Sequence, residues 1–219
     1  MSTPKITLYT YFRSSSSARL RIALHHKSLP FTSIPINLLQ GEQQSPDNLS
    51  RNPSGTVPTL VIEYADKSPV TITQSIAALE YLEEISPSLL PSDPASRAVV
   101  RSLCQILASD VQPVTNLKIL KRVAPLGMDR EAWSRELFED GFRAYEAIVK
   151  GTAGEFSVGD DVTMADVCLV PTVWGAERAG VKVEEYPTIS RIVERLEGVE
   201  AVQKGHWRTQ GDTPEEFRL

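Results

Sequence analysis

Hydrophobic and polar positions alternate in short blocks along the first 85 residues. Ile6, Leu8 and the aromatic residues that follow have the period-two spacing of a buried strand, and the apolar positions from 18 to 24 have the spacing of a helix. The further elements predicted here are, in chain order, a strand at 31–36, irregular chain with a short helical turn at 41–54, a turn entering a buried strand at 55–63, a strand at 70–72 and a helix at 74–85. Strands and helices in this order are typical of an α/β domain.

The composition changes at 86–94, where proline and serine predict a linker. Beyond this linker the sequence has no convincing strand pattern. Its spacing predicts a long helix at 95–123 with a kink at Pro113, followed by helices at 128–150, 164–179, 189–196 and 199–204. We therefore expect an α/β domain over residues 1–86 and an all-α domain over residues 94–219.

The helix expected at 164–179 begins with a strong start signal. Thr163 can cap it, and Asp166 can reach back to the N–H of the cap, which is the pattern of a capping box. Val162 and Val167 can add a hydrophobic staple. These features are structural, so we assign no catalytic role to the carboxylate of Asp166.

Four consecutive serines, Ser14–Ser17, lie between the first predicted strand and the first predicted helix. Serine is a preferred N-cap, and several N–H donors and the positive end of the helix dipole meet at a helix N-terminus. A serine run alone is more often a loop with a cap. Here the buried strand, the apolar helix and the nearby Arg13, Arg19 and Arg21 favour an anion-binding site.

A second anion site is predicted where Gln74 and Ser75 begin the next helix, although a plain N-cap is the alternative interpretation. Val57-Pro58 stands where a turn enters a buried strand, and a cis bond there would let Val57 pair with a peptide-like ligand as a strand does. Two helix N-termini and one exposed strand edge together suit a small, anionic, peptide-like molecule that carries a thiol.

Composition and charge exclude some classes of function. The chain has 219 residues, 41% of them hydrophobic, and a formal net charge of −5, which argues against a nucleic-acid surface and against attachment to an anionic membrane. The sequence has no membrane-length apolar run, and its N-terminus is polar, so a cytoplasmic location is expected. Cys104 and Cys168 lie in apolar helical patterns and are expected to be buried packing residues. The three histidines lack ligand spacing to any cysteine, and we expect no metal site.

These residues resemble the zeta class of the glutathione transferases over essentially the whole chain. The matching motifs are Tyr9-x-Tyr11-Phe12-Arg13-Ser14-Ser15 with Arg19-x-Arg21-Ile22-Ala23-Leu24, Asn37-Leu38, Val57-Pro58-Thr59-Leu60, Gln74-Ser75 before Glu80-Tyr81-Leu82-Glu83-Glu84, Gln112-Pro113 with Asn116-Leu117, and Gly159-Asp160-x-Val162-Thr163-Met164-Ala165-Asp166. The resemblance implies a thioredoxin-like N-terminal domain, an all-α C-terminal domain and a homodimer.

The resemblance also implies that glutathione is the cofactor. Its binding residues would be Ser14, Ser15, Ser16, Ser17, Ala18, Arg19, Gln44, Val57, Gln74 and Ser75, joined by Gln112, Asn116, Leu117 and Lys118 of the helical domain. Ser14, Ser15 and Ser16 would be catalytic, with Ser14 at the position that activates the thiol. A glutathione thiolate would then convert maleylacetoacetate to fumarylacetoacetate by cis–trans isomerisation, a step of tyrosine and phenylalanine breakdown.

The sequence departs from the family pattern at two positions. Ser16 stands in place of a cysteine and Ala18 in place of a tryptophan, which bears more on isomerase efficiency than on glutathione binding. Two alternatives stay open: a transferase or dehalogenase acting on small α-halo acids or other electrophiles, and a glutathione-binding protein with little turnover. The expected substrate is a dianion, and Arg13 and Arg178 are its candidate ligands. For Arg178, in a segment that resembles one near the family's substrate pocket, an ion pair with Glu177 is the structural alternative.

Overall fold

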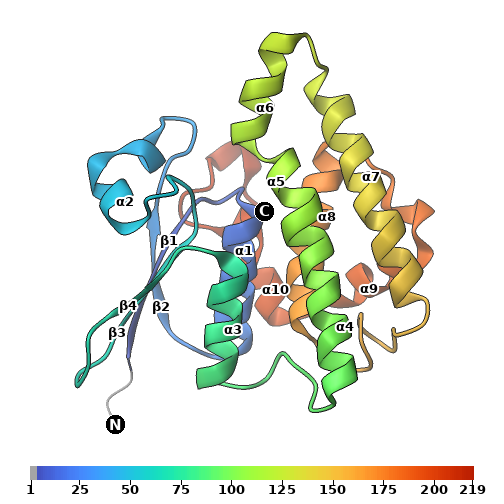
Figure 1. Cartoon of the computed structure of the whole chain (residues 1–219), viewed down its shortest axis with the longest axis horizontal. Helices are drawn as coiled ribbons and strands as arrows, with labels where there is room; N and C mark the ends of the chain where they lie inside the picture. The colour runs from blue at the N-terminus through green and yellow to red at the C-terminus, as the bar shows by residue number, and fades with distance from the viewer. Residues whose placement is uncertain (1–3) are drawn as a thin grey trace. The chain divides into compact units, whose positions relative to one another are not determined.

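A four-stranded mixed β-sheet forms the centre of the N-terminal part of the chain (Figure 1). In this computed structural model, which describes residues 4–219, the strand order is β2-β1-β3-β4. Strand β1 (Lys5–Thr10) is parallel to β2 (Phe31–Pro35) and antiparallel to β3 (Thr59–Glu63), which pairs in turn with β4 (Val70–Ile72). All four strands were predicted. Residues 1–3, which begin the polar N-terminus and the predicted first domain, lie outside the described residues.

The sheet carries the two helices that the sequence predicts. Helix α1 (Ser15–His26) follows β1, and α3 (Ser75–Ile85) follows β4. The buried side chains of Leu8 and Leu60, which are paired across β1 and β3, contribute to the core of this unit together with residues of α1 and α3. Burial of these apolar faces is what stabilises the strand–helix junctions at which the serines and Gln74 lie.

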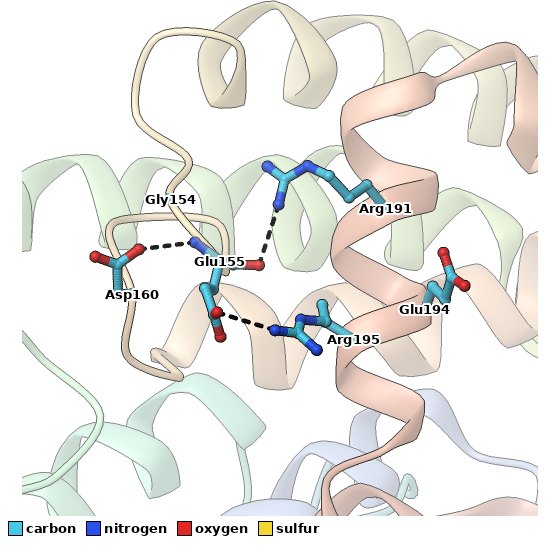
Figure 2. Close-up of a pocket in the computed structure, with 6 residues that line it drawn as sticks. All are labelled: Gly154, Glu155, Asp160, Arg191, Glu194 and Arg195. Carbon is cyan, nitrogen blue, oxygen red and sulfur yellow. Dashed lines mark hydrogen bonds and ion pairs between the residues drawn. The ribbon is translucent and has the colours of Figure 1, made fainter.

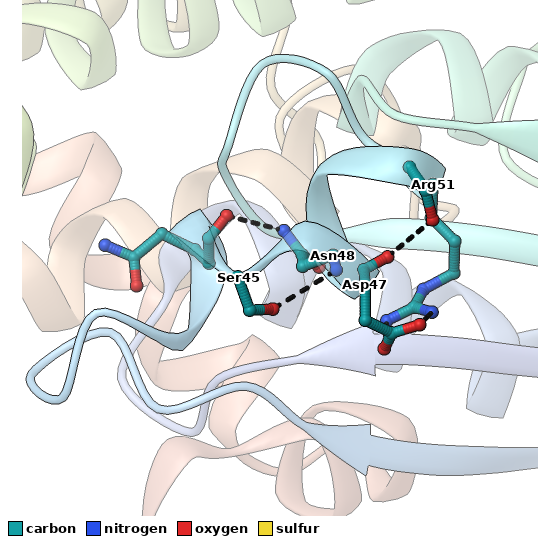
Figure 3. A network of polar contacts seen from close by, with 6 residues as sticks. Ser45, Asp47, Asn48 and Arg51 are labelled. Atoms are coloured by element: carbon teal, nitrogen blue, oxygen red, sulfur yellow. Dashed lines mark hydrogen bonds and ion pairs between the residues drawn. The ribbon is translucent and has the colours of Figure 1, made fainter.

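The polar segment 41–54 contains more helix than the single turn predicted from its sequence. It forms a 3₁₀ turn (Glu42–Gln44) and then α2 (Pro46–Arg51). Ser45 caps α2, because its Oγ accepts from the N–H of Asn48 over 3.2 Å, and the proline at the first helical position lacks an N–H that would need a partner (Figure 3).

The last twenty residues pack with the sheet domain. The chain divides into one compact unit formed by the residues up to Pro87 together with Glu200–Leu219, and a second formed by Ser88–Val199. Helix α10 (Glu200–Gly205) packs on α1, and a Cβ added at Gly205 would lie 2.5 Å from Cγ1 of Ile22. Only glycine allows this approach. The predicted domain 94–219 therefore includes a C-terminal segment, Glu200–Leu219, that belongs to the compact unit of the sheet.

The second unit is helical, and no named strand lies in its described residues, 88–199. Its helices are α4 (Pro94–Gln105), a π-helical turn (Ile106–Val111), α5 (Gln112–Thr115), α6 (Leu117–Val123), a 3₁₀ turn (Ala124–Leu126), α7 (Arg130–Val149), α8 (Met164–Arg178), a 3₁₀ turn (Val183–Glu185) and α9 (Pro187–Glu197). The predicted single helix at 95–123 is thus divided. Pro113 has no N–H for an i→i−4 bond, and the π turn and the break at Asn116 accommodate it.

The start of α8 confirms the predicted capping box of Thr163 and Asp166. The carboxylate of Asp166 accepts from the N–H of Thr163 over 2.8 Å and from the N–H of Ser157 over 2.9 Å. Burial raises the pKa of Asp166, and these hydrogen bonds oppose the rise. Cys104 and Cys168 are both buried and unlinked, as expected. Within residues 4–219, no helix is long and apolar enough to cross a membrane.

Candidate active site

Ser14 is the N-cap of α1. Its backbone is extended (φ −74°, ψ 116°), and its Oγ accepts a hydrogen bond from the N–H of Ser17 over 3.2 Å. A hydroxyl that accepts through its oxygen still carries its own proton, so Ser14 can donate to an anion beyond the helix N-terminus. The first N–H groups of the helix and the positive end of its dipole lie at the same place. This arrangement suits a thiolate.

The other residues of the serine run differ in exposure. Ser15 is half-buried, whereas Ser16, Ser17 and Ala18 are buried. The Oγ of Ser17 has no hydrogen-bond partner among the described residues. The side chains of Ser14 and Ser15 are therefore the more accessible hydroxyls of the predicted site.

Arg19 connects the two predicted anion sites. Its Nη1 donates to the Oγ of Ser75 over 3.1 Å, and its side chain is buried. Ser75 is the first residue of α3, whose N-cap is Gln74. Gln74 is exposed and its side chain makes no capping bond, so its amide is available to a ligand. The buried position of Arg19 indicates that it holds Ser75 in place rather than presenting its own charge to solvent.

The loop before β3 carries Val57, and the Val57–Pro58 peptide bond is cis. The side chain of Gln44 donates to the carbonyl of Gly55 over 3.0 Å. Gly55 has a positive φ of 59°, and a Cβ there would lie 2.4 Å from Nε2 of Gln44. The backbone angle favours glycine, and the amide of Gln44 occupies the space that a Cβ would need. Part of the amide of Gln44 is therefore engaged in supporting the loop that carries Val57.

Asn52 supports the same loop from inside the protein, and no sequence motif points to this residue. Its Nδ2 donates to the carbonyl of Thr56 over 3.0 Å and to Oγ1 of Thr59 over 3.2 Å. The side chain is fully buried. Asn52 thus ties the residue before Val57 to the first residue of β3.

The predicted residues of the helical unit lie at the turn between α5 and α6. Gln112 begins α5, while Asn116 caps α6 by accepting from the N–H of Ile119 over 3.1 Å and donating to the carbonyl of Pro113 over 2.9 Å. Both polar groups of Asn116 thus shape the turn. Leu117 and Lys118 follow as the first residues of α6, and Lys118 is exposed.

The two candidate substrate arginines are exposed in different units. Arg178 is the last residue of α8. Burial and the nearby Glu197 raise the pKa of Glu177, and the charge of Arg178 opposes this rise. The guanidinium of Arg13, which precedes Ser14, lies 5.7 Å from the ring centroid of Phe217.

A surface hollow of about 640 Å³ in the helical unit contains none of the predicted site residues (Figure 2). Its lining is charged, and Arg195 pairs with the carboxylate of Glu155 over 2.9 Å. The same Glu155 accepts from Arg191 through its carbonyl oxygen. These contacts are local to the hollow and involve no residue of the predicted site.

Comparisons with known proteins place the chain in a family. The family model described as glutathione S-transferase, N-terminal domain, matches residues 13–85, and that of the C-terminal domain matches residues 127–204. A maleylacetoacetate isomerase of Aspergillus fumigatus is 68% identical, with 100% of this chain and 97% of the relative covered. The chain belongs to the zeta class of the glutathione S-transferases.

Two further comparisons agree with this membership of the zeta class. A mouse maleylacetoacetate isomerase is 45% identical, with both chains covered completely. The crystal structure of a maleylacetoacetate isomerase from Anaeromyxobacter dehalogenans 2CP-1, with bound glutathione in the active site, has a TM-score of 0.89 and 36% identity, covering 98% of this chain and 100% of that one. The thioredoxin-like and helical fold expected from the resemblance is thereby confirmed.

Proposed function

We propose that the protein is a glutathione-dependent isomerase that converts maleylacetoacetate to fumarylacetoacetate, a step in tyrosine and phenylalanine breakdown. The observation that carries the proposal is the cap of α1, where the Oγ of Ser14 accepts from the N–H of Ser17 and keeps its own proton for a thiolate. The Aspergillus fumigatus and mouse relatives, which match this chain over its full length, carry the name of that activity.

The residues of the first unit fit glutathione. Its thiol would lie at the N-terminus of α1, and its γ-glutamyl carboxylate at the N-terminus of α3, where Gln74 and Ser75 offer an amide and a hydroxyl. Val57, in the supported loop before β3, would pair with the peptide backbone of the ligand. By resemblance to the zeta class, Gln112, Asn116 and Lys118 are further candidate ligands of glutathione.

When bound, glutathione would supply the thiolate nucleophile for reversible addition to the cis double bond of the substrate, which permits isomerisation without net consumption of glutathione. The protein's part is to keep the thiol ionised. A thiol of pKa ~8.5 is mostly protonated at neutral pH, and lowering that pKa by about two units requires only ~2.7 kcal/mol. A hydroxyl donor and a helix N-terminus together can supply this energy. Arg178 and Arg13 would bind the carboxylates of the substrate.

One assay separates this function from its alternatives. Purified protein is mixed with maleylacetoacetate and a small amount of glutathione, and both the trans product and the remaining thiol are measured. We expect many turnovers per glutathione with no loss of thiol, because isomerisation regenerates it. Consumption of glutathione without trans product, or consumption only with an α-halo acid, would indicate a transferase. Binding of glutathione with neither reaction would indicate a binding protein.

We propose further that the unit with the sheet acts as the glutathione domain, and the helical unit Ser88–Val199 as the substrate domain, of a cytoplasmic homodimer. The resemblance to the zeta class supports the dimer, and the absence of a basic surface or membrane-length segment in the sequence supports the location. Light scattering on the purified protein tests the dimer, for which a mass of twice the 24.2 kDa chain is expected.

A further inference from the structure

The loop between β1 and Ser14 is held by side chains that lie far away in the sequence. The N–H of Phe12 donates to Oδ2 of Asp212 over 2.9 Å, and the carbonyl of Phe12 accepts from Nη2 of Arg21 over 3.0 Å. The N–H of Ser14 itself donates to the carbonyl of Tyr11 over 3.0 Å, and that carbonyl also accepts from Arg21. The backbone on both sides of Phe12 is therefore fixed immediately before the catalytic cap.

Arg21 binds the loop and the C-terminal segment at the same time. Its Nη1 donates to Oγ1 of Thr10 over 2.9 Å, and its Nε donates to the carbonyl of Gly205 in α10 over 3.1 Å. The side chain is fully buried, and burial lowers its pKa to about 10, which still leaves it charged at neutral pH. The fixed fork of a guanidinium can bind several acceptors in different directions, which an ammonium on a flexible stem does less well.

Aromatic contacts join the same parts of the chain. The ring centroid of Phe12 lies 6.4 Å from that of Trp207, which in turn lies 6.1 Å from that of Phe217. Gly205 makes its close contact with Ile22 beside the bond to Arg21. Residues 200–219 thus contact α1 and the loop before it at several independent points, all within one compact unit.

We infer that Arg21 and Asp212 are positioning residues for the isomerase, through which the C-terminal segment fixes the loop Tyr11–Arg13 and hence the hydroxyl of Ser14. Neither is assigned contact with glutathione or substrate. The inference rests on the proposed function in that it takes Ser14 as the thiol-activating residue. A hydrogen bond to a thiolate depends steeply on geometry, so a small displacement of the cap would raise the pKa of the bound thiol.

Asp212 is the better residue to change, because Arg21 is buried and its loss could prevent folding. Asp212 is only partly buried and borders a surface hollow of about 860 Å³, so shortening it opens no cavity in the core. The test compares Asp212→Ala with Asp212→Asn, whose amide oxygen can still accept from Phe12. Glu216→Ala, an exposed carboxylate of the same segment, is the matched control.

Two readouts are taken for each variant: the pKa of bound glutathione from thiolate absorbance against pH, and kcat/KM for isomerisation. For Asp212→Ala we expect the thiol pKa to rise by about 0.5 to 1 unit and kcat/KM to fall about five- to tenfold. Asp212→Asn and Glu216→Ala should stay within about twofold of the unchanged protein.

Three results would overturn the inference: an unchanged thiol pKa in Asp212→Ala, an equal loss in Asp212→Asn, or an equal loss in Glu216→Ala. The first would remain decisive if Asp212→Ala lowered only the melting temperature, since that is the signature of a merely structural role. If the unchanged protein binds glutathione but does not isomerise, the proposed function fails while the thiol titration still judges the role of Asp212.

Discussion

Arg19 donates from its Nη1 to the Oγ of Ser75 over 3.1 Å and so joins the second turn of α1 to the first turn of α3. Because the oxygen of Ser75 accepts this charged hydrogen bond, its own proton is left to be donated to a ligand. Arg19 lies in the interior, so it acts on the ligand through Ser75. The same arrangement, an accepting oxygen with an available proton, occurs at Ser14.

This relationship predicts the effect of Ser75→Ala. Loss of the hydroxyl removes the hydrogen bond that Ser75 accepts from Arg19 and the one that it would donate to the ligand carboxylate, and glutathione affinity should fall about tenfold. The pKa of the bound thiol should not change, because the thiol lies at the other helix. Isothermal titration calorimetry measures the affinity. Ser50→Ala, an exposed serine on α2, is the control and should bind normally. Normal binding by Ser75→Ala would exclude it from the glutathione site.

The serine at position 16, where the family pattern has cysteine, leads to a second prediction. Ser16 lies in the first turn of α1. Ser16→Cys should increase isomerase turnover more than it increases conjugation of a generic electrophile, because sulfur is more polarisable beside the reacting carbon. Both rates are measured on the same preparation. Equal or lower isomerase turnover would mean that the site has adapted to serine.

The dianionic substrate needs a cation, and Arg178 is the candidate from the helical unit. A bidentate arginine–carboxylate contact is worth ~1.5 to 3 kcal/mol, so Arg178→Ala should lower kcat/KM about ten- to a hundredfold. Glutathione affinity should hardly change. Arg191→Ala, in the charged surface hollow, is the matched control. The assignment fails if Arg178→Ala keeps full activity on the dianion, or loses activity equally on a neutral electrophile.

Asp166 is predicted to matter for stability alone. It is fully buried and accepts from the N–H groups of Thr163 and Ser157, and its removal leaves these donors without a partner. Asp166→Ala should lower the free energy of unfolding by ~3 to 5 kcal/mol. Denaturant titration measures this, with the exposed Asp161→Ala as control. A change below about 1 kcal/mol would show that the helix start does not depend on this carboxylate.

Local signals in the sequence were sufficient to predict the strands, helix α1 and the N-cap at Thr163. Each depends on residues within one turn or one strand, such as the serine that caps α1 or the alternation around Leu8. The sequence predicted a kink at Pro113, but the helix is interrupted on either side of this residue, by a π turn and at Asn116. Proline removes one backbone hydrogen bond, but it does not determine which neighbouring residues change their hydrogen bonding. The π turn spans residues 106–111.

Long-range contacts could not be predicted. Asp212 is 200 residues from Phe12, and nothing around it in the sequence indicates a partner. Asn52 and Gly55 resemble ordinary loop residues until the loop that they support is seen. In the sequence, Arg21 is one of three cations near the serines, whereas its four hydrogen bonds to backbone and side-chain oxygens make it an internal support.

The most direct test of the account is the thiolate titration of bound glutathione in Ser14→Ala. Absorbance of the thiolate is followed against pH with glutathione near saturation, and affinity is measured separately. Ser45→Ala is the matched control, because it removes the N-cap of α2, which lies outside the predicted site. We predict that Ser14→Ala raises the thiol pKa by about one unit or more and leaves affinity largely intact, while Ser45→Ala changes neither. An unchanged titration curve in Ser14→Ala would contradict the account and move thiol activation to Ser15 or to the backbone N–H groups of α1.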